Sequence, residues 1–254
     1  MNSIQKIKIF FRSRHVFKNW LIFPSIYFKT SKKSHAIFET KNDFKLKIRI
    51  NSTDIMTLTN VWLMNEYDKK FEIKENDVVI DIGAHIGLFS LFASQYCKNG
   101  KIFSYEPIKE NFELFLENID LNQLQNIHAF NSAVSKTDGK VRIFYNEDEA
   151  GHSIFGNNED NVSVNSVSLQ KIFDENEIVH CNFLKIDCEG AEYEIIDTLP
   201  DEYFDKIDKI VIEYHFADSK PELSKKLISR LKKMQFKTYL PPHYDDMGIL
   251  YAKK

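Results

Sequence analysis

The chain has 254 residues, of which 43% are hydrophobic and 28% charged, so it contains enough apolar material for one large or two small cores and is not a disordered chain. Its net charge is −3, but residues 1–38 hold 8 Lys or Arg and no Asp or Glu, which leaves 26 basic against 37 acidic residues in the remainder. The 3 cysteines form no C-x-x-C pair, which argues against a disulfide framework and a structural zinc site and favours a reducing, cytoplasmic compartment.

Residues 1–43 are predicted to form a basic, aromatic-rich N-terminal arm, and residues 44–254 a single catalytic domain. The longest apolar stretch of the arm, WLIFPSIYF, is interrupted by Pro24 and is far shorter than the roughly 20 residues of a membrane-spanning helix. It also lacks the cleavage site of a secretory signal. Such an arm could lie on the anionic inner surface of a membrane, bind a partner, or pack as a leading helix on the catalytic domain. These three alternatives stay open.

Beyond the arm, residues 44–50 (FKLKIRI) alternate apolar and basic side chains as a half-exposed strand does, and Thr53 or Asp54 could cap a helix that follows. From residue 77 onward, short runs of Val, Ile and Phe alternate with amphipathic helical patterns. These strand-like runs lie at 77–82, 101–106, 127–131, 182–187 and 209–215. Continuous apolar strands that alternate with helices predict an α/β fold, with a mostly parallel sheet covered by helices on both faces.

Two stretches depart from this alternation. Residues 140–145 and 162–167 return to a β pattern and predict an inserted β-ribbon near 140–167, whose polar loop could cover a site. At the C-terminus, FKTYL and MGILYAKK flank a turn that contains Pro241 and Pro242. Two strands joined by such a turn pair antiparallel, so we expect a C-terminal hairpin that brings the sheet to seven strands.

The turn after the first parallel strand carries Gly83 and Gly87 within VVIDIGAHIG. Glycines at a strand-to-helix turn allow a ligand to approach the main chain at the positive end of the helix. The spacing Gly-x-x-x-Gly matches neither the dinucleotide fingerprint nor the phosphate loop, and no basic residue follows before Lys98. With Asp81 nearby, the loop favours a zwitterionic or cationic ligand over a polyphosphate. The alternative is a plain turn in which the glycines only allow tight packing.

Polar residues follow each predicted parallel strand, which is where ligands bind in open α/β sheets. They are Asp81, Glu106, Asn131, Ser132, Asp187, Glu189, Glu213 and His215. Glu106 follows Asp81 by 25 residues and can accept hydrogen bonds from the 2′ and 3′ hydroxyls of a ribose. This position predicts a cofactor that contains adenosine.

The motifs VVIDIGAHIG, SYEP, NSAVS and FLKIDCEGAE resemble those of the FkbM family of class I S-adenosylmethionine-dependent methyltransferases, over about residues 54–215. The resemblance implies a Rossmann-like class I methyltransferase fold, S-adenosylmethionine as cofactor, and methyl transfer to a hydroxyl of a sugar, glycan or secondary metabolite. His85 stands where the family usually carries Asn, which would alter the contact with the methionine part slightly. The cofactor-binding residues that the resemblance implies are Asp81, Gly83, His85 and Gly87 at the methionyl end, Glu106 on the ribose, Ser132 beside the adenine and Asp187 near the sulfonium.

Methyl transfer to a hydroxyl requires an aligned nucleophile and removal of its proton. His215 is the preferred base, because the ordinary histidine pKa of about 6.5 suits proton transfer near neutrality, and Asp187 and Glu213 are the other catalytic candidates. A solvated histidine at a strand end is the structural alternative. No metal is predicted, but if a divalent cation is present, its candidate ligands are Asp187, Glu189, Glu213 and His215.

Two other functions stay open at this point. One is an NAD-dependent oxidoreductase with Glu106 on the ribose, against which the missing third glycine argues. The other is a non-catalytic cofactor-binding module that docks through its basic arm. The expected partners are a small-molecule or glycan acceptor and no nucleic acid.

Overall fold

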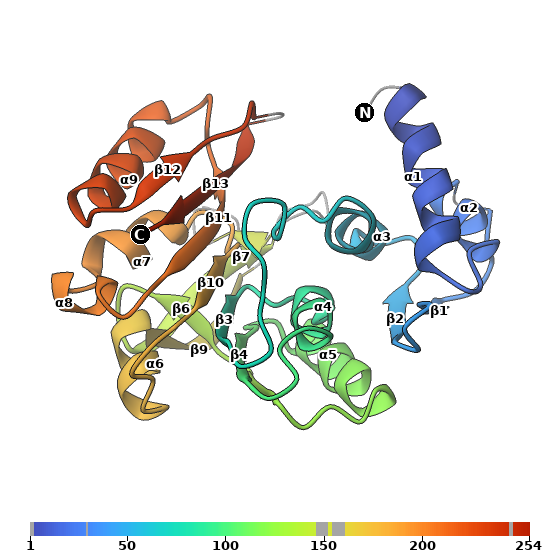
Figure 1. Ribbon diagram of the computed structural model, residues 1–254, viewed down its shortest axis with the longest axis horizontal. Helices are drawn as coiled ribbons and strands as arrows, with labels where there is room; N and C mark the ends of the chain where they lie inside the picture. The colour runs from blue at the N-terminus through green and yellow to red at the C-terminus, as the bar shows by residue number, and fades with distance from the viewer. Residues whose placement is uncertain (1–2, 29, 146–151, 154–160, 244–245) are drawn as a thin grey trace.

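The central sheet has seven strands in the order β12-β13-β11-β10-β3-β4-β5 (Figure 1). The computed structural model describes residues 3–28, 30–145, 152–153, 161–243 and 246–254. The strands of this sheet are β3 (Val78–Ile82), β4 (Lys101–Tyr105), β5 (Ile127–Phe130), β10 (Phe183–Ile186), β11 (Lys209–His215), β12 (Lys237–Tyr239) and β13 (Met247–Lys253). The strands from β5 to β11 pair in parallel, and β13 pairs antiparallel with both β11 and β12. The predicted α/β sheet with an antiparallel C-terminal hairpin is confirmed.

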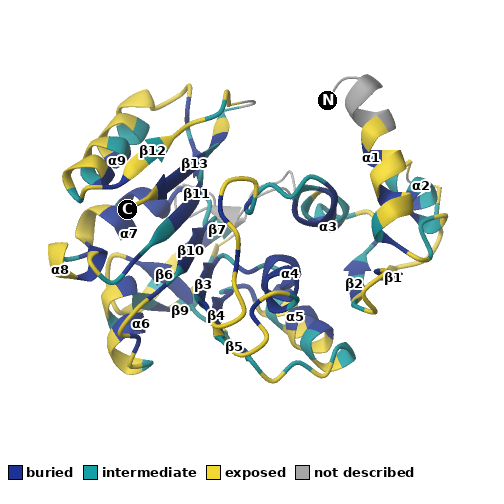
Figure 2. Ribbon diagram, in the orientation of Figure 1, coloured by how far each residue is buried: buried dark blue, intermediate teal, exposed yellow. Residues whose placement is uncertain are grey.

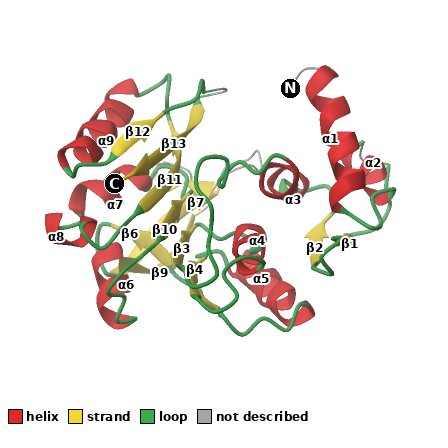
Figure 3. Cartoon of the chain, viewed as in Figure 1, coloured by secondary structure: helices red, strands yellow, loops and turns green. Residues whose placement is uncertain are grey.

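Helices cover both faces of the sheet (Figure 3). One layer contains α4 (Leu88–Ser94) and α5 (Lys109–Leu121), and the other contains α6 (Leu169–Glu175), α7 (Glu192–Thr198), α8 (Asp201–Phe204) and α9 (Pro221–Lys233). Neighbouring strand residues alternate between the two layers. Val79 packs into the layer of α4 and α5, whereas Ile80 packs into the opposite one. Because both faces are covered, the parallel strands are buried along almost their whole length (Figure 2).

A smaller sheet with the order β6-β9-β7-β8 is inserted after β5. It consists of β6 (Ala133–Ser135), β7 (Gly139–Tyr145), β8 (His152–Ser153) and β9 (Asn161–Ser168). β7 and β9 pair antiparallel from Gly139↔Ser166 to Phe144↔Asn161. They occupy the stretch predicted as a ribbon, whereas most of the loop predicted to cover a site lies outside the described residues.

The described residues up to 63 pack against the layer of α4 and α5. Their elements are α1 (Ser3–Val16), α2 (Ile22–Tyr27), β1 (His35–Glu39), β2 (Lys45–Arg49), α3 (Asp54–Leu58) and the π-helix η1 (Thr59–Leu63). β1 and β2 pair antiparallel, and the domain boundary predicted between residues 43 and 44 falls in the turn between them. Phe17 and Phe38 are fully buried in the same cluster as Phe92 and Phe115 of α4 and α5.

The outer surface of this N-terminal unit carries several apolar side chains. Phe11, Leu21 and Phe28 are 57%, 71% and 67% exposed. Across the described residues, the helices lack the combination of length and apolarity that a membrane-spanning segment requires.

Gly87, at the start of α4, is held in place by packing. Its φ is +83°, and a Cβ built on it would lie 1.9 Å from Cδ2 of Phe115 on α5. Gly87→Ala is therefore expected to lower the free energy of unfolding by about 2 kcal/mol or more, since a backbone penalty adds to an overpacked core. Gly139→Ala is the matched control, because φ is +119° there but nothing lies within 4 Å of the new Cβ. Thermal unfolding that showed equal losses for the two variants would contradict the packing role.

Candidate functional site

A cavity of about 1160 Å³ lies at the carboxyl ends of the parallel strands, bordered by the N-terminal unit. Its lining includes residues 83–85 after β3, which we call the Gly83 loop. It also includes Glu106 after β4, residues 187–189 after β10, Glu213 of β11 and residues 49–53 of the N-terminal unit. Typical ligand pockets have about 300–1,000 Å³. The cavity is therefore large enough for a cofactor and an acceptor side by side.

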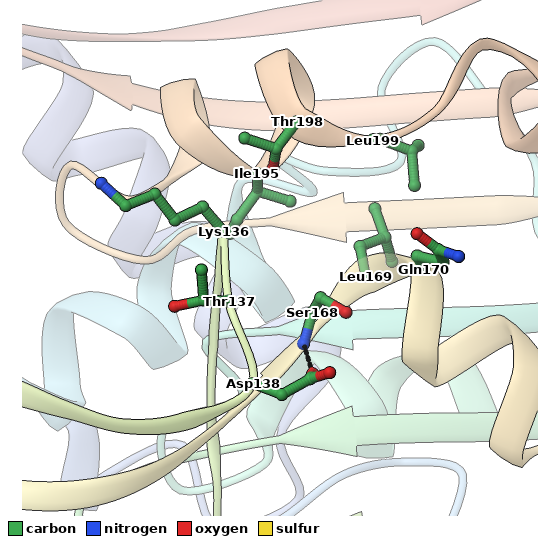
Figure 4. A pocket seen from close by; sticks show the side chains of 9 residues that line it. All are labelled: Lys136, Thr137, Asp138, Ser168, Leu169, Gln170, Ile195, Thr198 and Leu199. Carbon is green, nitrogen blue, oxygen red and sulfur yellow. Dashed lines mark hydrogen bonds between the residues drawn. The ribbon is translucent and has the colours of Figure 1, made fainter.

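A second, smaller hollow of about 310 Å³ lies between the inserted sheet, α6 and α7 (Figure 4). Its charged side chains already have partners. Lys136 Nζ lies 3.0 Å from a Glu194 carboxylate oxygen, and Asp138 accepts a hydrogen bond from the backbone N–H of Ser168. It lacks the convergent acidic groups of the larger cavity, so we assign the functional site to the larger one.

The Gly83 loop is fixed by a buried ion pair. Lys185 in β10 is only 2% exposed, donates a 2.7 Å hydrogen bond to the carbonyl of Gly83, and lies 3.1 Å from Asp81 Oδ1. Gly83 has φ +76°, and a Cβ there would lie 1.6 Å from the backbone oxygen of Asp187. The chain segment that approaches this loop closely is thus the end of β10. Asp81 is fully buried on Lys185, and neither Asp81 nor Gly87 lines the cavity, so their predicted contacts with the cofactor stay a prediction and their observed contacts are with the protein.

Glu106 lies at the end of β4 with its carboxylate fixed by three donors. Oε2 accepts a 2.8 Å hydrogen bond from the backbone N–H of His85, and Oε1 accepts from the backbone N–H of Ile108 and the side-chain amide of Asn111. Burial raises the pKa of Glu106 to about 7, against these hydrogen bonds, which lower it. A carboxylate has about four acceptor sites, so one remains for a ligand hydroxyl, not the two predicted.

Ser132 does not line the cavity. Its hydroxyl oxygen lies 3.1 Å from each of the carbonyl oxygens of Ala133 and Asn165, which share its one hydrogen. The neighbouring part of the lining consists of the apolar residues Ala133, Val134 and Ile143. The place predicted for Ser132, beside the adenine, stays a prediction.

Tyr67 joins two carboxylates at the ends of β10 and β11. Its hydroxyl lies 2.9 Å from Asp187 Oδ2 and 2.9 Å from Glu213 Oε2. A phenol has one hydrogen and can donate to only one carboxylate, so the other contact requires a protonated carboxyl. Burial and the neighbouring Asp187 raise the pKa of Glu213 to about 8. The Tyr67 hydroxyl thus links the two carboxyl groups, and the raised pKa of Glu213 favours a proton shared within this cluster.

His215 is held between two carboxylates. Nδ1 lies 3.2 Å from Glu192 Oε1, and Nε2 lies 3.2 Å from Glu189 Oε2. Burial disfavours the charged ring, but Glu192 and Glu189 outweigh it and raise the pKa of His215 to about 10. A ring that is protonated at neutral pH cannot accept a further proton, and His215 does not line the cavity. The role of His215 as the base stays a prediction, and these contacts favour a positioning role instead.

Glu189 lies at the junction of this ion pair and the cavity. It has φ 52°, a left-handed conformation that is unusual for a residue other than glycine, and its carboxylate lines the cavity. Burial raises the pKa of Glu189 to about 7, and the charge of His215 opposes that rise. A carboxylate with a pKa near neutrality can take up a proton in the working pH range.

Three of the four candidate metal ligands lie close together, and Glu189 is not part of their group. Asp187, Glu213 and His215 each offer one ligand atom, and these atoms all lie within 4.8 Å of one another. Both nitrogens of His215 face carboxylates, however, and the Tyr67 hydroxyl bridges the other two groups. Because metals bind neutral imidazole, a divalent cation would have to displace a proton from His215.

Several residues of the site were not predicted from the sequence. They are Arg49, Tyr67, Asn111, Lys185 and Glu192. Lys185 had a signal, because a lysine inside an apolar parallel strand needs a buried partner. Arg49 was read as the exposed face of a strand. The caps predicted at Thr53 or Asp54 are also wrong, since neither side chain caps α3 and the carboxylate of Asp54 binds Arg49 instead.

Comparison with models of protein families matches residues 81–238 to the Methyltransferase FkbM domain. Among curated proteins, Methyltransferase 1 of Beauveria bassiana (strain ARSEF 2860) is 24% identical, over 62% of this chain and 72% of its own. Hexuronic acid methyltransferase AglP of Haloferax volcanii is 23% identical, over 63% of this chain and 65% of its own.

Among solved structures, the methyltransferase FkbM from Methylobacillus flagellatus KT superimposes with a TM-score of 0.51 at 17% identity. The match covers 73% of this chain and 45% of that one, so this chain corresponds to less than half of the solved protein. At this identity the likeness concerns the fold, which agrees with the sheet order described above.

Proposed function

The chain belongs to the methyltransferase FkbM domain family, and from this premise we propose that it transfers a methyl group from S-adenosylmethionine to a hydroxyl of a sugar, glycan or secondary metabolite. The observation that carries the proposal is the position of Glu106. Its carboxylate lies at the end of β4, in the cavity lining, and keeps one acceptor site for a ribose hydroxyl.

The other walls of the cavity fit the remaining parts of the cofactor. Ala133, Val134 and Ile143 offer an apolar surface to the adenine, and the Gly83 loop and His85 border the methionyl end. When bound, S-adenosylmethionine supplies a methyl group on a positively charged sulfur. The carboxylates of the strand ends would favour that charge in the bound state. The NAD alternative has no support in the family match.

The proton of the acceptor hydroxyl would pass to Glu189. Glu189 lines the cavity, and His215 Nε2 lies 3.2 Å from its Oε2 as an ion-pair partner. Glu192 fixes His215 in turn, because its buried carboxylate accepts the backbone N–H of His215 and lies 3.2 Å from Nδ1. Glu189 is thus the proposed base, and His215 and Glu192 are positioning residues. Asp187 and Glu213 remain close to the reacting groups through Tyr67.

The position of methylation can be tested on the product. The name of the Haloferax relative makes hexuronic acid glycosides the first acceptors to test, with neutral glycosides beside them. Incubation with S-adenosylmethionine carrying a labelled methyl group is expected to give a methyl ether, which survives mild alkali. An alkali-labile product would be a methyl ester and would contradict transfer to a hydroxyl, while leaving methyltransferase activity intact.

A further inference from the structure

Arg49, at the end of β2, is fixed in an uncommonly rigid way for a residue on a cavity wall. Its backbone N–H and Nε both donate to Asp54 Oδ2, and Nη2 donates to Asp54 Oδ1 at 2.8 Å. Asp54 is fully buried. The same Nη2 also donates to Asn111 Oδ1 at 2.8 Å, and Asn111 in turn donates to Glu106. The guanidinium is therefore held in one orientation before any ligand arrives.

One edge of this guanidinium has no protein acceptor. Nε and Nη2 are used as described, whereas within the described part of the chain no residue accepts a hydrogen bond from Nη1. The side chain is 30% exposed, and Arg49 lines the cavity. Two N–H groups at a fixed position on a cavity wall match the geometry of a carboxylate or phosphate oxygen.

His85 lies beside Arg49 on the same cavity wall. Its Nε2 lies 3.2 Å from Arg49 Nη2 and 3.4 Å from Asp54 Oδ1, so the ring packs against the Arg49–Asp54 pair. Burial lowers the pKa of His85 to about 4, which keeps the ring neutral at pH 7. A neutral neighbour does not compete with a ligand for the charge of the guanidinium.

We propose that Arg49 binds a carboxylate of a ligand in the cavity through its Nη1 edge. The N-terminal hairpin thereby completes a site whose remainder is built by the catalytic domain. The inference rests on the proposed function and concerns a residue that no motif in the sequence identified. The carboxylate has two sources, the amino-acid end of the cofactor or an acidic acceptor. His85 belongs to the Gly83 loop, where the methionyl end is proposed to lie, so the cofactor is the first source to test.

The test compares ligands that differ by one carboxylate. S-adenosylmethionine and its decarboxylated form are titrated calorimetrically into the full-length protein. The wild-type protein is expected to bind S-adenosylmethionine about 10- to 100-fold more tightly than the decarboxylated form, as a charge-assisted hydrogen bond warrants. Arg49→Lys keeps a cation for Asp54 but removes the guanidinium fork, and it is expected to reduce this ratio about 5-fold or more.

Controls separate recognition from folding and from charge. The double variant Lys32→Gln/Lys33→Gln removes two exposed cations from the same cavity and is expected to leave the ratio unchanged. The double variant Arg49→Gln/Asp54→Asn removes the ion pair as a unit and avoids a stranded buried carboxylate. It is expected to lower the ratio as Arg49→Lys does. Because each ratio is measured within one protein, a general loss of stability cancels.

A second titration tests the acceptor as the source of the carboxylate. Methyl glucuronide and methyl glucoside are titrated into the protein with S-adenosylhomocysteine bound. In this experiment the wild-type protein could prefer the glucuronide by about 10-fold or more and Arg49→Lys could lose that preference. If the two cofactor forms also bind equally well, the proposal is supported with the acceptor as the source of the carboxylate. The proposal would be overturned if Arg49→Lys changed neither the affinity ratio of the two cofactor forms nor that of the two glycosides. It would also be overturned if the wild-type protein bound the ligands with and without a carboxylate equally well. Failure of the proposed function differs, since neither S-adenosylmethionine nor S-adenosylhomocysteine would then bind the wild-type protein.

Discussion

Glu189→Gln is expected to lower the rate of methyl transfer by about 10²- to 10⁴-fold, which is the usual contribution of a positioned base. The substitution preserves the shape of the side chain but removes its charge, so both the ability to accept a proton and the ion pair with His215 are lost. Affinity for S-adenosylmethionine is expected to change by about 3-fold or less, because the residue faces the acceptor in this account. Single-turnover kinetics with the identified acceptor would measure the rate, and calorimetry the affinity.

The pH dependence of the wild-type rate provides an independent check. The base must be ionised to act, and burial raises the pKa of Glu189 to about 7, so the rate is expected to rise as the pH increases through about 7. This rise is expected to disappear in Glu189→Gln. Glu194→Gln, on α7 and paired with Lys136, is the matched control and should behave as the wild type. Wild-type turnover in Glu189→Gln would show that the base is another group, and loss of activity with a chelator would instead implicate a bound cation.

Glu106→Gln is expected to weaken S-adenosylmethionine binding by about 10- to 100-fold. The loss corresponds to about 1.5–3 kcal/mol for a hydrogen bond to a charged acceptor. The new amide NH₂ would also face the backbone N–H of His85 or Ile108, which places two donors against each other. The ionised form is the better acceptor, and burial raises the pKa of Glu106 to about 7, so wild-type affinity should decrease as the pH falls below about 7.

Glu110→Gln is the matched control for Glu106, because it removes a carboxylate from the lining of the same cavity. It is expected to change the affinity by about 2-fold or less. Thermal unfolding of both variants without ligand would show whether the three donors that Glu106 satisfies also matter for stability. Equal affinities of Glu106→Gln and the wild type would remove Glu106 from the ribose contact.

The sheet could be predicted from the sequence because its signals are local. Runs of Val, Ile and Phe mark the parallel strands, and the paired strands around Pro241 and Pro242 mark the C-terminal hairpin. The hairpin of β1 and β2 was cut by the predicted boundary because composition changes from basic to mixed charge there, whereas strand pairing ignores charge. The charge pattern thus described the surface of the N-terminal unit and not its packing.

The site was predicted less completely, because side-chain direction depends on contacts between distant segments. Glu106 and Gly83 could be assigned from their places after strands, and both line the cavity. His215 is the last residue of its strand, yet its ring turns to Glu192, 23 residues earlier in the chain. Arg49 looked like an exposed strand residue until Asp54 and Asn111 were seen to hold it. Pairings of this kind cannot be read from spacing.

Calorimetric titration of the full-length protein with S-adenosylmethionine, S-adenosylhomocysteine and NAD tests the central claim most directly. The account predicts that both S-adenosyl ligands bind at one site per chain, that NAD shows no comparable binding, and that Glu106→Gln weakens both S-adenosyl ligands together. Binding of NAD without binding of either S-adenosyl ligand would contradict the account, and so would the absence of binding by all three.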